Sequence, residues 1–395
     1  MHYSRSLALS LSLAMVAVSG TGIAAQNHAD HGATAAQTAA PSVGAPTRTF
    51  NAPANDQGEA TLAARARTQE LSRDKFQVPL DFRFTDRIVE SGITFVHQIV
   101  DDAGKTYKAA HYDHGNGITA GDVDGDGRID LYFTTQMGSN QLWRNLGSGK
   151  FENITAAAGV GLAGRVGVSA SFADIDNDGD LDLYVTTVRM GNALFENDGK
   201  GHFTDISKAA GVDYVGHSSS AVFLDYDRDG LLDLFLVNVG KYTTEERGRG
   251  GYYLAREDAF ASHRFPERTE TSVLYRNLGG RRFEDVSRGT GLVDGSWSGD
   301  ASLTDFNRDG YPDLYVLNMQ GDNHYWENQA GKSFVDKTPQ VFPKTPWGAM
   351  GIKSFDYDND GYQDLFIANG HLHDNVQAYD PLGVYEQPNL LFHNH

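Results

Sequence analysis

The chain has 395 residues, with 33 lysines and arginines against 52 aspartates and glutamates, so its formal net charge is −19 at pH 7. This length suits one large domain or two ordinary ones. The acidic balance excludes a general nucleic-acid binder, which would follow phosphates with a stripe of basic side chains. The chain contains no cysteine, so no disulfide links its segments, and another kind of cross-link is expected.

The N-terminus has the pattern of a secretory signal. Arg5 supplies the positive charge, Leu7–Val18 is a short apolar run, and Ala24 or Ala25 offers a cleavage site. Residues 1–25 are therefore assigned as the signal peptide of an exported protein, periplasmic or extracellular. An uncleaved anchor is the alternative. No later apolar run approaches the roughly 20 residues of a membrane span, so we expect no span after cleavage.

Residues 26–75 follow the signal peptide, are rich in Ala, Thr, Gln and Pro, and are expected to be a disordered linker.

A carboxylate-rich segment recurs along the rest of the chain. The first copy of the segment reads DVDGDGRID, and the five copies begin at Asp122, Asp174, Asp225, Asp305 and Asp356. Their spacing is about 51 residues, except where an insertion at 241–271 lengthens the third interval. A fixed period of this size is typical of propellers, solenoids and arrays.

Each repeat also carries short runs of β-branched and aromatic residues, such as SASFAD, DLYVTT, ALFENDG and HFTDIS in the second repeat. Four strands in such a unit are typical of a propeller blade, so the predicted fold is all-β: a β-propeller of five four-stranded blades within residues 76–395. The last repeat lacks a fourth run, and Arg83–Ile93 resembles His202–Val212, which holds one. We expect this N-terminal strand to close the ring. The alternative is six or seven blades in a longer chain.

Each carboxylate-rich copy places side-chain oxygens at positions 1, 3, 5 and 9, with glycine at position 6. These side chains are Asp122, Asp124, Asp126 and Asp130; Asp174, Asp176, Asp178 and Asp182; Asp225, Asp227, Asp229 and Asp233; Asp305, Asn307, Asp309 and Asp313; and Asp356, Asp358, Asp360 and Asp364. Alternating oxygens that curve around one point suit Ca²⁺, which takes about six to eight of them. The position 7 carbonyl is expected to add a ligand, and it belongs to Arg128, Asp180, Leu231, Tyr311 and Tyr362.

The pattern predicts about five Ca²⁺ ions, one in each loop. The loops are not EF-hands, because an apolar residue replaces glutamate at position 12: Phe133, Val185, Leu236, Val316 and Ile367. An acidic β-turn is the alternative for a single copy, since Asp and Gly both favour turns. Five copies in register favour a cation, because bare carboxylates this close repel one another. We expect the ions to be structural cross-links in place of disulfides.

The carboxylate segment and the DLYVTT run after it resemble the FG-GAP or VCBS repeat of integrin α-chain propellers. The wider sequence resembles the family of cartilage acidic protein and bacterial ASPIC/UnbV proteins, through Gly92–His97, Leu274–Ser287 and Phe342–Gly361. The resemblance covers residues 82–395. It implies a propeller with calcium in its loops and, from the integrin relatives, a ligand surface on the opposite face. Family members usually carry a further C-terminal UnbV-type region, and this chain is expected to end before it.

The connections opposite the calcium loops form the expected ligand face. The longest are the insertion at 241–271 and Gly370–Pro388, and long connections in compact domains are often functional. The candidate ligand-face side chains are His111, His114, His217, Trp297, Trp347, His371 and His373. The histidines suit a transition-metal or acid–base site, and the tryptophans suit a sugar ring. The plainer alternatives are hydrogen-bonded loop histidines and tryptophans that plug the channel.

Three functions are consistent with these features. The first is an exported, calcium-stabilised propeller that binds a protein or glycan. The second is a polysaccharide lyase or hydrolase with His114 and His371 at its centre, since a propeller scaffold is neutral about chemistry. The third is a truncated remnant of a longer family member. The sequence assigns no catalytic residue, no nucleic-acid partner and no oligomeric state.

Overall fold

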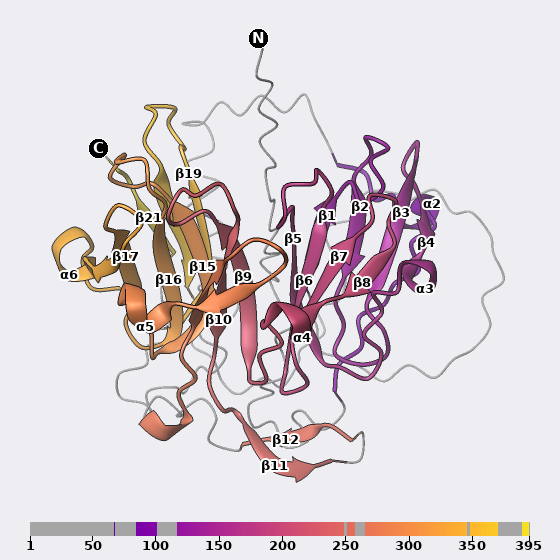
Figure 1. Ribbon diagram of the computed structural model, residues 1–395, viewed down its shortest axis with the longest axis horizontal. Coiled ribbons are helices and arrows are strands. Elements are labelled where there is room, and N and C mark those ends of the chain that lie inside the picture. Colours follow the sequence, from indigo (N-terminus) through magenta and orange to yellow (C-terminus); the bar gives the residue numbers. More distant parts are fainter. Residues whose placement is uncertain are drawn as a thin grey trace. The chain divides into compact units, whose positions relative to one another are not determined.

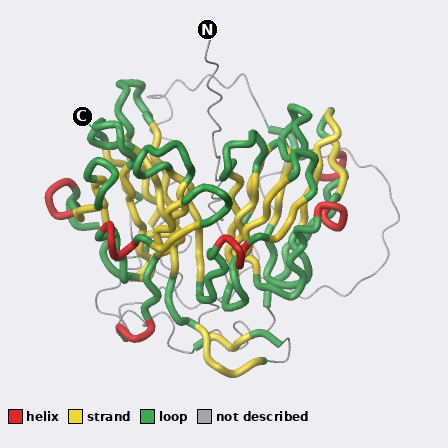
Figure 2. Tube along the Cα trace, in the orientation of Figure 1, coloured by secondary structure: helices red, strands yellow, loops and turns green. Residues whose placement is uncertain are grey.

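The computed structural model describes Arg67 and residues 84–100, 117–248, 251–256, 265–345, 348–369 and 389–394. The described residues from Asp86 onward belong to one compact unit, and those before Asp86 are assigned to another. The described strands all belong to the first of these, and Figure 2 shows that strands dominate it, with one-turn helices between them.

The strands form five successive repeat units, numbered here 1 to 5 (Figure 1). Unit 1 contains β1 (Ile118–Gly121), β2 (Asp130–Phe133), β3 (Gln141–Gly147) and β4 (Lys150–Asn153). Unit 2 contains β5 (Gly167–Ala173), β6 (Asp182–Thr187), β7 (Ala193–Asn197) and β8 (Phe203–Asp205). Unit 3 contains β9 (Ser218–Leu224), β10 (Asp233–Asn238), β13 (Val273–Asn277) and β14 (Phe283–Asp285). Unit 4 contains β15 (Trp297–Thr304), β16 (Asp313–Gln320), β17 (His324–Asn328) and β18 (Phe334–Asp336). Unit 5 contains β19 (Ala349–Phe355), β20 (Asp364–Asn369) and β21 (Leu390–Phe392).

Units 1 to 4 are four-stranded antiparallel sheets, and the described part of unit 5 is a three-stranded one. The all-β prediction and the four-stranded repeat are therefore confirmed. The insertion in unit 3 adds a separate hairpin of β11 (Thr243–Arg247) and β12 (Tyr253–Ala255), followed by a 3₁₀ turn at Pro266–Arg268. The one-turn helices are α2 (Ile88–Ser91), α3 (Thr155–Ala158), α4 (Ser207–Ala210), α5 (Ser287–Thr290) and α6 (Thr338–Val341).

The hydrophobic cores lie between neighbouring sheets. One cluster joins Tyr132 and Leu142 of unit 1 to Leu183 of unit 2, and equivalent clusters join the later units in pairs. Strands β6 and β10 are buried along their whole length, which explains why their sequences run apolar on both faces instead of alternating. The first strands of successive units, β1, β5, β9, β15 and β19, contact one another in chain order, as blades around an axis do.

Closure of the ring stays a prediction. Among the described residues, β19 makes no comparable contact with β1, and no strand is assigned at 84–87. Phe84 is 94% exposed, whereas Phe334 at the matching place in unit 4 is 4% exposed. Gly92, which follows α2, lies against the carbonyl of Phe151 in unit 1. In the same way Gly159, which follows α3, lies against the carbonyl of Phe203 in unit 2. Helix α2 thus sits on unit 1 as α3 sits on unit 2, so the segment before α2 remains the candidate for the missing fourth strand.

Candidate metal centre

Five carboxylate loops join the first strand of each unit to the second. Loops 1 to 5 are residues 122–130, 174–182, 225–233, 305–313 and 356–364. In loop 1, Oδ1 of Asp122 accepts a hydrogen bond from the backbone N–H of Asp126 (3.1 Å), and Oδ2 accepts one from Gly127 (2.7 Å). The same two bonds recur in the other loops. Gly127 has φ +82°, a backbone conformation that glycine adopts without strain, which accounts for glycine at position 6.

The position 9 aspartate ties the loop to its own sheet. In unit 2, Oδ2 of Asp182 accepts from the N–H of Ile175 (3.1 Å), and Oδ1 accepts from the N–H of Asn197 on β7 (2.9 Å). Equivalent pairs hold the other position 9 aspartates. Burial raises the pKa of Asp182 and of Asp233 to about 7, against these backbone hydrogen bonds, which act in the opposite direction.

In units 2 to 5, an asparagine at or just after the end of the third strand bonds the loop of the preceding unit. Nδ2 of Asn197 donates to the carbonyl of Val123 in loop 1 (2.8 Å), and Nδ2 of Asn277 donates to Ile175 in loop 2 (2.7 Å). Asn328 and Asn394 repeat the contact with loops 3 and 4. Because loops 1 to 4 each bond the next unit, an interaction that fixes one of these loops also fixes the junction between two units.

The loop oxygens converge. Within each group the ligand atoms lie within 4.8 Å of one another, and the groups are Asp122, Asp124 and Asp130; Asp174, Asp176 and Asp178; Asp225, Asp227 and Asp229; and Asp356, Asp358 and Asp364. Oδ1 of Asp124 and Oδ1 of Asp176 are buried without a hydrogen-bond partner in the described part of the chain. Burial and then the neighbouring carboxylates raise the pKa of Asp124. Buried, unpartnered oxygens facing other carboxylates fit a hard divalent cation.

Loop 4 differs from the others in one ligand. Asn307 stands at position 3, and its Nδ2 donates to Oδ2 of Asp309 (3.1 Å). The amide can present its oxygen after a flip, since its two ends are assigned from hydrogen bonding alone. The loop still has aspartates at positions 1, 5 and 9, so at the four side-chain ligand positions it has one carboxylate fewer than each of the other loops.

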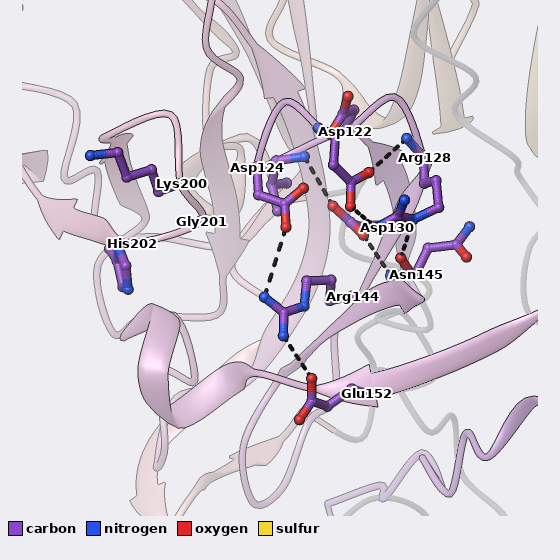
Figure 3. Close-up of polar contacts among 12 residues, drawn as sticks. Asp122, Asp124, Arg128, Asp130, Arg144, Asn145, Glu152, Lys200, Gly201 and His202 are labelled. Atoms are coloured by element: carbon purple, nitrogen blue, oxygen red, sulfur yellow. Dashed lines mark hydrogen bonds and ion pairs between the residues drawn. The ribbon is translucent and has the colours of Figure 1, made fainter. Parts of the chain in front are cut away.

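Side chains from the third strand reach the loops, and sequence reasoning missed them. In unit 1, Nη1 of Arg144 lies 3.9 Å from Oδ2 of Asp124, and Nη2 lies 2.7 Å from Glu152 (Figure 3). His393 of unit 5 is grouped with Asp358 and Asp360, so loop 5 has a nitrogen ligand available beside its oxygens. A signal was present, because LWRN, LFEN, LYRN, YWEN and LFHN all place a polar residue before the asparagine.

The predicted ligand-face residues are only partly described. His111, His114, Trp347, His371 and His373 lie outside the described residues, so the enzymatic alternative at His114 and His371 stays a prediction. The other two are His217, which is 2% exposed, and Trp297, which is 3% exposed. A ligand role for either also stays a prediction.

His217 anchors the insertion instead of facing solvent. Its Nδ1 lies 3.1 Å from Oε1 of Glu270, and its Nε2 lies 2.8 Å from Oγ1 of Thr243, so both ring nitrogens contact the insertion. Trp297 packs in a cluster with Val239 and Tyr242 at the same place.

The insertion hairpin is held by unit 2. Nη1 of Arg189 donates to the carbonyl of Thr244 (2.7 Å), Nη2 pairs with Glu245 (2.8 Å), and the guanidinium lies 3.8 Å from the ring centroid of Tyr253. Loop 3 precedes β10 and the insertion follows it, so the β11–β12 hairpin starts from the end of β10 that lies away from loop 3. Figure 1 shows the hairpin projecting beyond the strands of unit 3.

Comparison with known proteins identifies the repeat. The FG-GAP-like repeat family matches residues 122–185, 174–236 and 305–367. Human cartilage acidic protein 1 is 25% identical over 285 residues, which cover 71% of this chain and 39% of the relative. The Mus musculus protein of that name is 27% identical over 305 residues, covering 69% of this chain and 42% of the relative. The chain therefore carries FG-GAP-like repeats and is homologous to cartilage acidic protein 1, and it spans about two fifths of the length of these relatives.

Two solved structures are similar at lower identity. An Agrocybe aegerita protein, described by its specific recognition of non-reducing terminal N-acetylglucosamine, is 16% identical with a TM-score of 0.38, covering 71% of this chain and 66% of that one. The V. cholerae biofilm matrix protein Bap1 is 13% identical with a TM-score of 0.33, covering 64% of this chain and 34% of that one. In the described part of the chain, no helix has the length and apolarity to cross a membrane.

Proposed function

We propose that this chain, an FG-GAP-like repeat protein homologous to cartilage acidic protein 1, is an exported, calcium-stabilised β-propeller that binds a protein or glycan partner. Residues 1–25 direct export, residues 26–75 form a linker, and residues 76–395 form the binding domain. The partner binds on the face opposite the carboxylate loops, where the β11–β12 hairpin lies.

The observation that carries the calcium proposal is the convergence of carboxylates in repeated loops, with buried and unpartnered oxygens at Asp124 and Asp176. Positions 1, 3, 5 and 9 and the position 7 carbonyl of each loop would hold the ion. A bound Ca²⁺ supplies positive charge that offsets the repulsion within the loop. The chain's own contribution is to hold the loop open at the junction of two units through the asparagine contacts already described.

The test is metal content and thermal melting of the secreted chain with calcium and with chelator. We expect about five bound ions and a melting temperature at least about 5 °C lower in chelator, because ligand binding to the folded state adds to stability. Asp174→Asn with Asp176→Asn should remove one ion. Glu284→Gln, which neutralises an exposed carboxylate on β14 outside the loops, is the matched control. Equal melting with and without calcium would contradict the proposal.

The partner proposal rests on the hairpin, which is held in place by Arg189 and carries exposed charges at its turn. Glu246 and Arg247 are both exposed, and Arg247 is braced by the carbonyl of Gly251 (2.8 Å). A braced, charged turn on a long insertion suits recognition by a polar partner.

A glycan array and a panel of purified extracellular matrix proteins test this surface. Glu246→Ala with Arg247→Ala should lower binding of any hit by about tenfold, because hot spots in interfaces are few and often include arginine. Arg288→Ala, an exposed arginine on α5, is the control for charge. Unchanged binding by the hairpin variant would move the partner site elsewhere.

A further inference from the structure

One side chain beside each carboxylate loop changes its charge from unit to unit. It precedes the third-strand asparagine, and it is Arg144, Glu196, Arg276, Glu327 and His393 in units 1 to 5. The asparagine that follows it bonds the loop and is buried in units 2, 3 and 4, so the same strand sets the position of this side chain relative to the loop.

In unit 3 this side chain brings a fixed cation to loop 3. Nη2 of Arg276 lies 2.7 Å from Oδ2 of Asp227 and 3.2 Å from Oδ2 of Asp229, the side chains of positions 3 and 5. The guanidinium is 40% exposed and Asp227 is 12% exposed, so the contact is partly shielded from water. An arginine stays charged at every accessible pH, so it occupies these ligands whenever calcium does not.

Loop 1 is approached in the same way. Arg144 lies against Asp124 and is shared with Glu152, as Figure 3 shows. Arg128 within the loop also pairs with Asp126. The carboxylates at positions 3 and 5 therefore each contact a guanidinium in loop 1, and the same two positions contact the guanidinium of Arg276 in loop 3.

Units 2 and 4 have a carboxylate at this place. Glu196 is 15% exposed and pairs with Arg281 of the next unit, whose Nε lies 3.6 Å from Oδ2 of Asp176. Glu327 is 22% exposed and lies 3.9 Å from Lys337. Glu196 therefore shares Arg281 with Asp176, so within the described residues one carboxylate of loop 2 faces a guanidinium, whereas two do in loop 1 and two in loop 3.

We propose that Arg276 and Arg144 make loops 3 and 1 weak calcium sites of this chain, while Glu196, which shares Arg281 with Asp176, leaves loop 2 a stronger one. The proposal rests on calcium binding by the loops, as put forward under Proposed function. Calcium at a weak site must displace guanidinium groups from two loop carboxylates, whereas at loop 2 it meets one guanidinium, which Glu196 also holds. The chain then fills in two steps as calcium rises.

Titration calorimetry of the full chain at low salt tests this with Arg276→Gln. The wild type should show two classes of site, and the variant should move one site from the weak class to the strong one, with affinity at least about fivefold higher. Glu196→Arg should do the reverse, moving one site from the strong class to the weak one. Arg276→Lys keeps the charge and should stay near the wild type, and Arg288→Gln controls for net charge.

The outcomes separate the two proposals. Calcium isotherms that superimpose for the wild type, Arg276→Gln and Glu196→Arg, with ions bound in all three, would overturn the role of these side chains and leave calcium binding intact. No calcium binding by any of them would overturn the proposed function and this inference with it. Arg276→Lys tightening as much as Arg276→Gln would show that packing and not charge sets the affinity, and would also overturn the inference.

Discussion

Replacing Asn277 with alanine removes the contact that joins unit 3 to unit 2. Its Nδ2 donates to the carbonyl of Ile175 (2.7 Å) and to that of Leu232 (3.1 Å), and its Oδ1 accepts from the N–H of Gly279 (2.9 Å). The residue is 1% exposed, so water does not replace these bonds without rearrangement. The main-chain bond from Asn277 to Asp233 does not involve the side chain and is retained.

The expected loss follows from the groups left unpaired. Each hydrogen bond contributes about 1 kcal/mol net, and each buried group left without a partner costs about 1–3 kcal/mol. Three bonds are lost, so the free energy of unfolding should fall by about 3 kcal/mol or somewhat more. Urea denaturation in saturating calcium measures this value.

Asn145→Ala is the matched control from unit 1. Its Nδ2 donates to Ile129 of its own loop (3.0 Å) and its Oδ1 accepts from Gly147 (2.9 Å), and within the described residues it bonds no other unit. Asn145 is also half-buried, so its loss should be about 1 kcal/mol. If the two variants lose the same stability, the contact between units contributes nothing measurable, and the reasoning is wrong.

Two further predictions concern the loops and the hairpins that cover them. Burial raises the pKa of Asp182 and of Asp233 to about 7 in the folded protein, from about 4 in the unfolded chain. Between these two pH values the folded, metal-free protein therefore binds more protons than the unfolded chain. The contribution of these two groups to stability is fully present below about pH 4 and is lost as the pH rises through about 7. The melting temperature in chelator should therefore fall between pH 5 and pH 8, calcium should flatten the slope, and a rising melting temperature in chelator would contradict the assignment. Gly331→Ala places a Cβ 2.8 Å from Cα of Asp227, and Gly331 has φ +74°. Gly280 has a similar φ of +59° but open space where a Cβ would lie, so Gly331→Ala should lower the free energy of unfolding by about 1–3 kcal/mol more than Gly280→Ala. Equal losses in urea denaturation would show that the hairpin of Gly331 does not press on loop 3.

The repeat and its loops were readable from the sequence because their information is local. A carboxylate at every second position, glycine at position 6 and an apolar strand after it recur within about a dozen residues, and β-structure follows from the same short runs. Loop bonds such as that from Gly127 to Asp122 span only five residues. These features need no knowledge of the rest of the chain.

The contacts between units were not readable in this way. Asn277 and Ile175 are 102 residues apart, and nothing near either one identifies the other as its partner. His217 was a candidate for the ligand face, and nothing near it in the sequence indicates that its ring nitrogens contact Glu270 and Thr243 of the insertion. An insertion with no counterpart in the other units leaves no repeat from which its return path can be inferred.

Loops 1 to 4 lie where two units meet, so the calcium binding proposed for them would be coupled to the order of the units. The outer hairpin of the following unit packs on the loop before it: Gly201 of unit 2 lies against Val123 and Asp124, and Gly331 of unit 4 lies against Asp227. Under the proposed function, a cation in one of these loops would therefore stabilise two units at once. Loss of one ion should loosen one junction, and the loosening should spread along the chain of units, since a repeat array draws much of its stability from such interfaces.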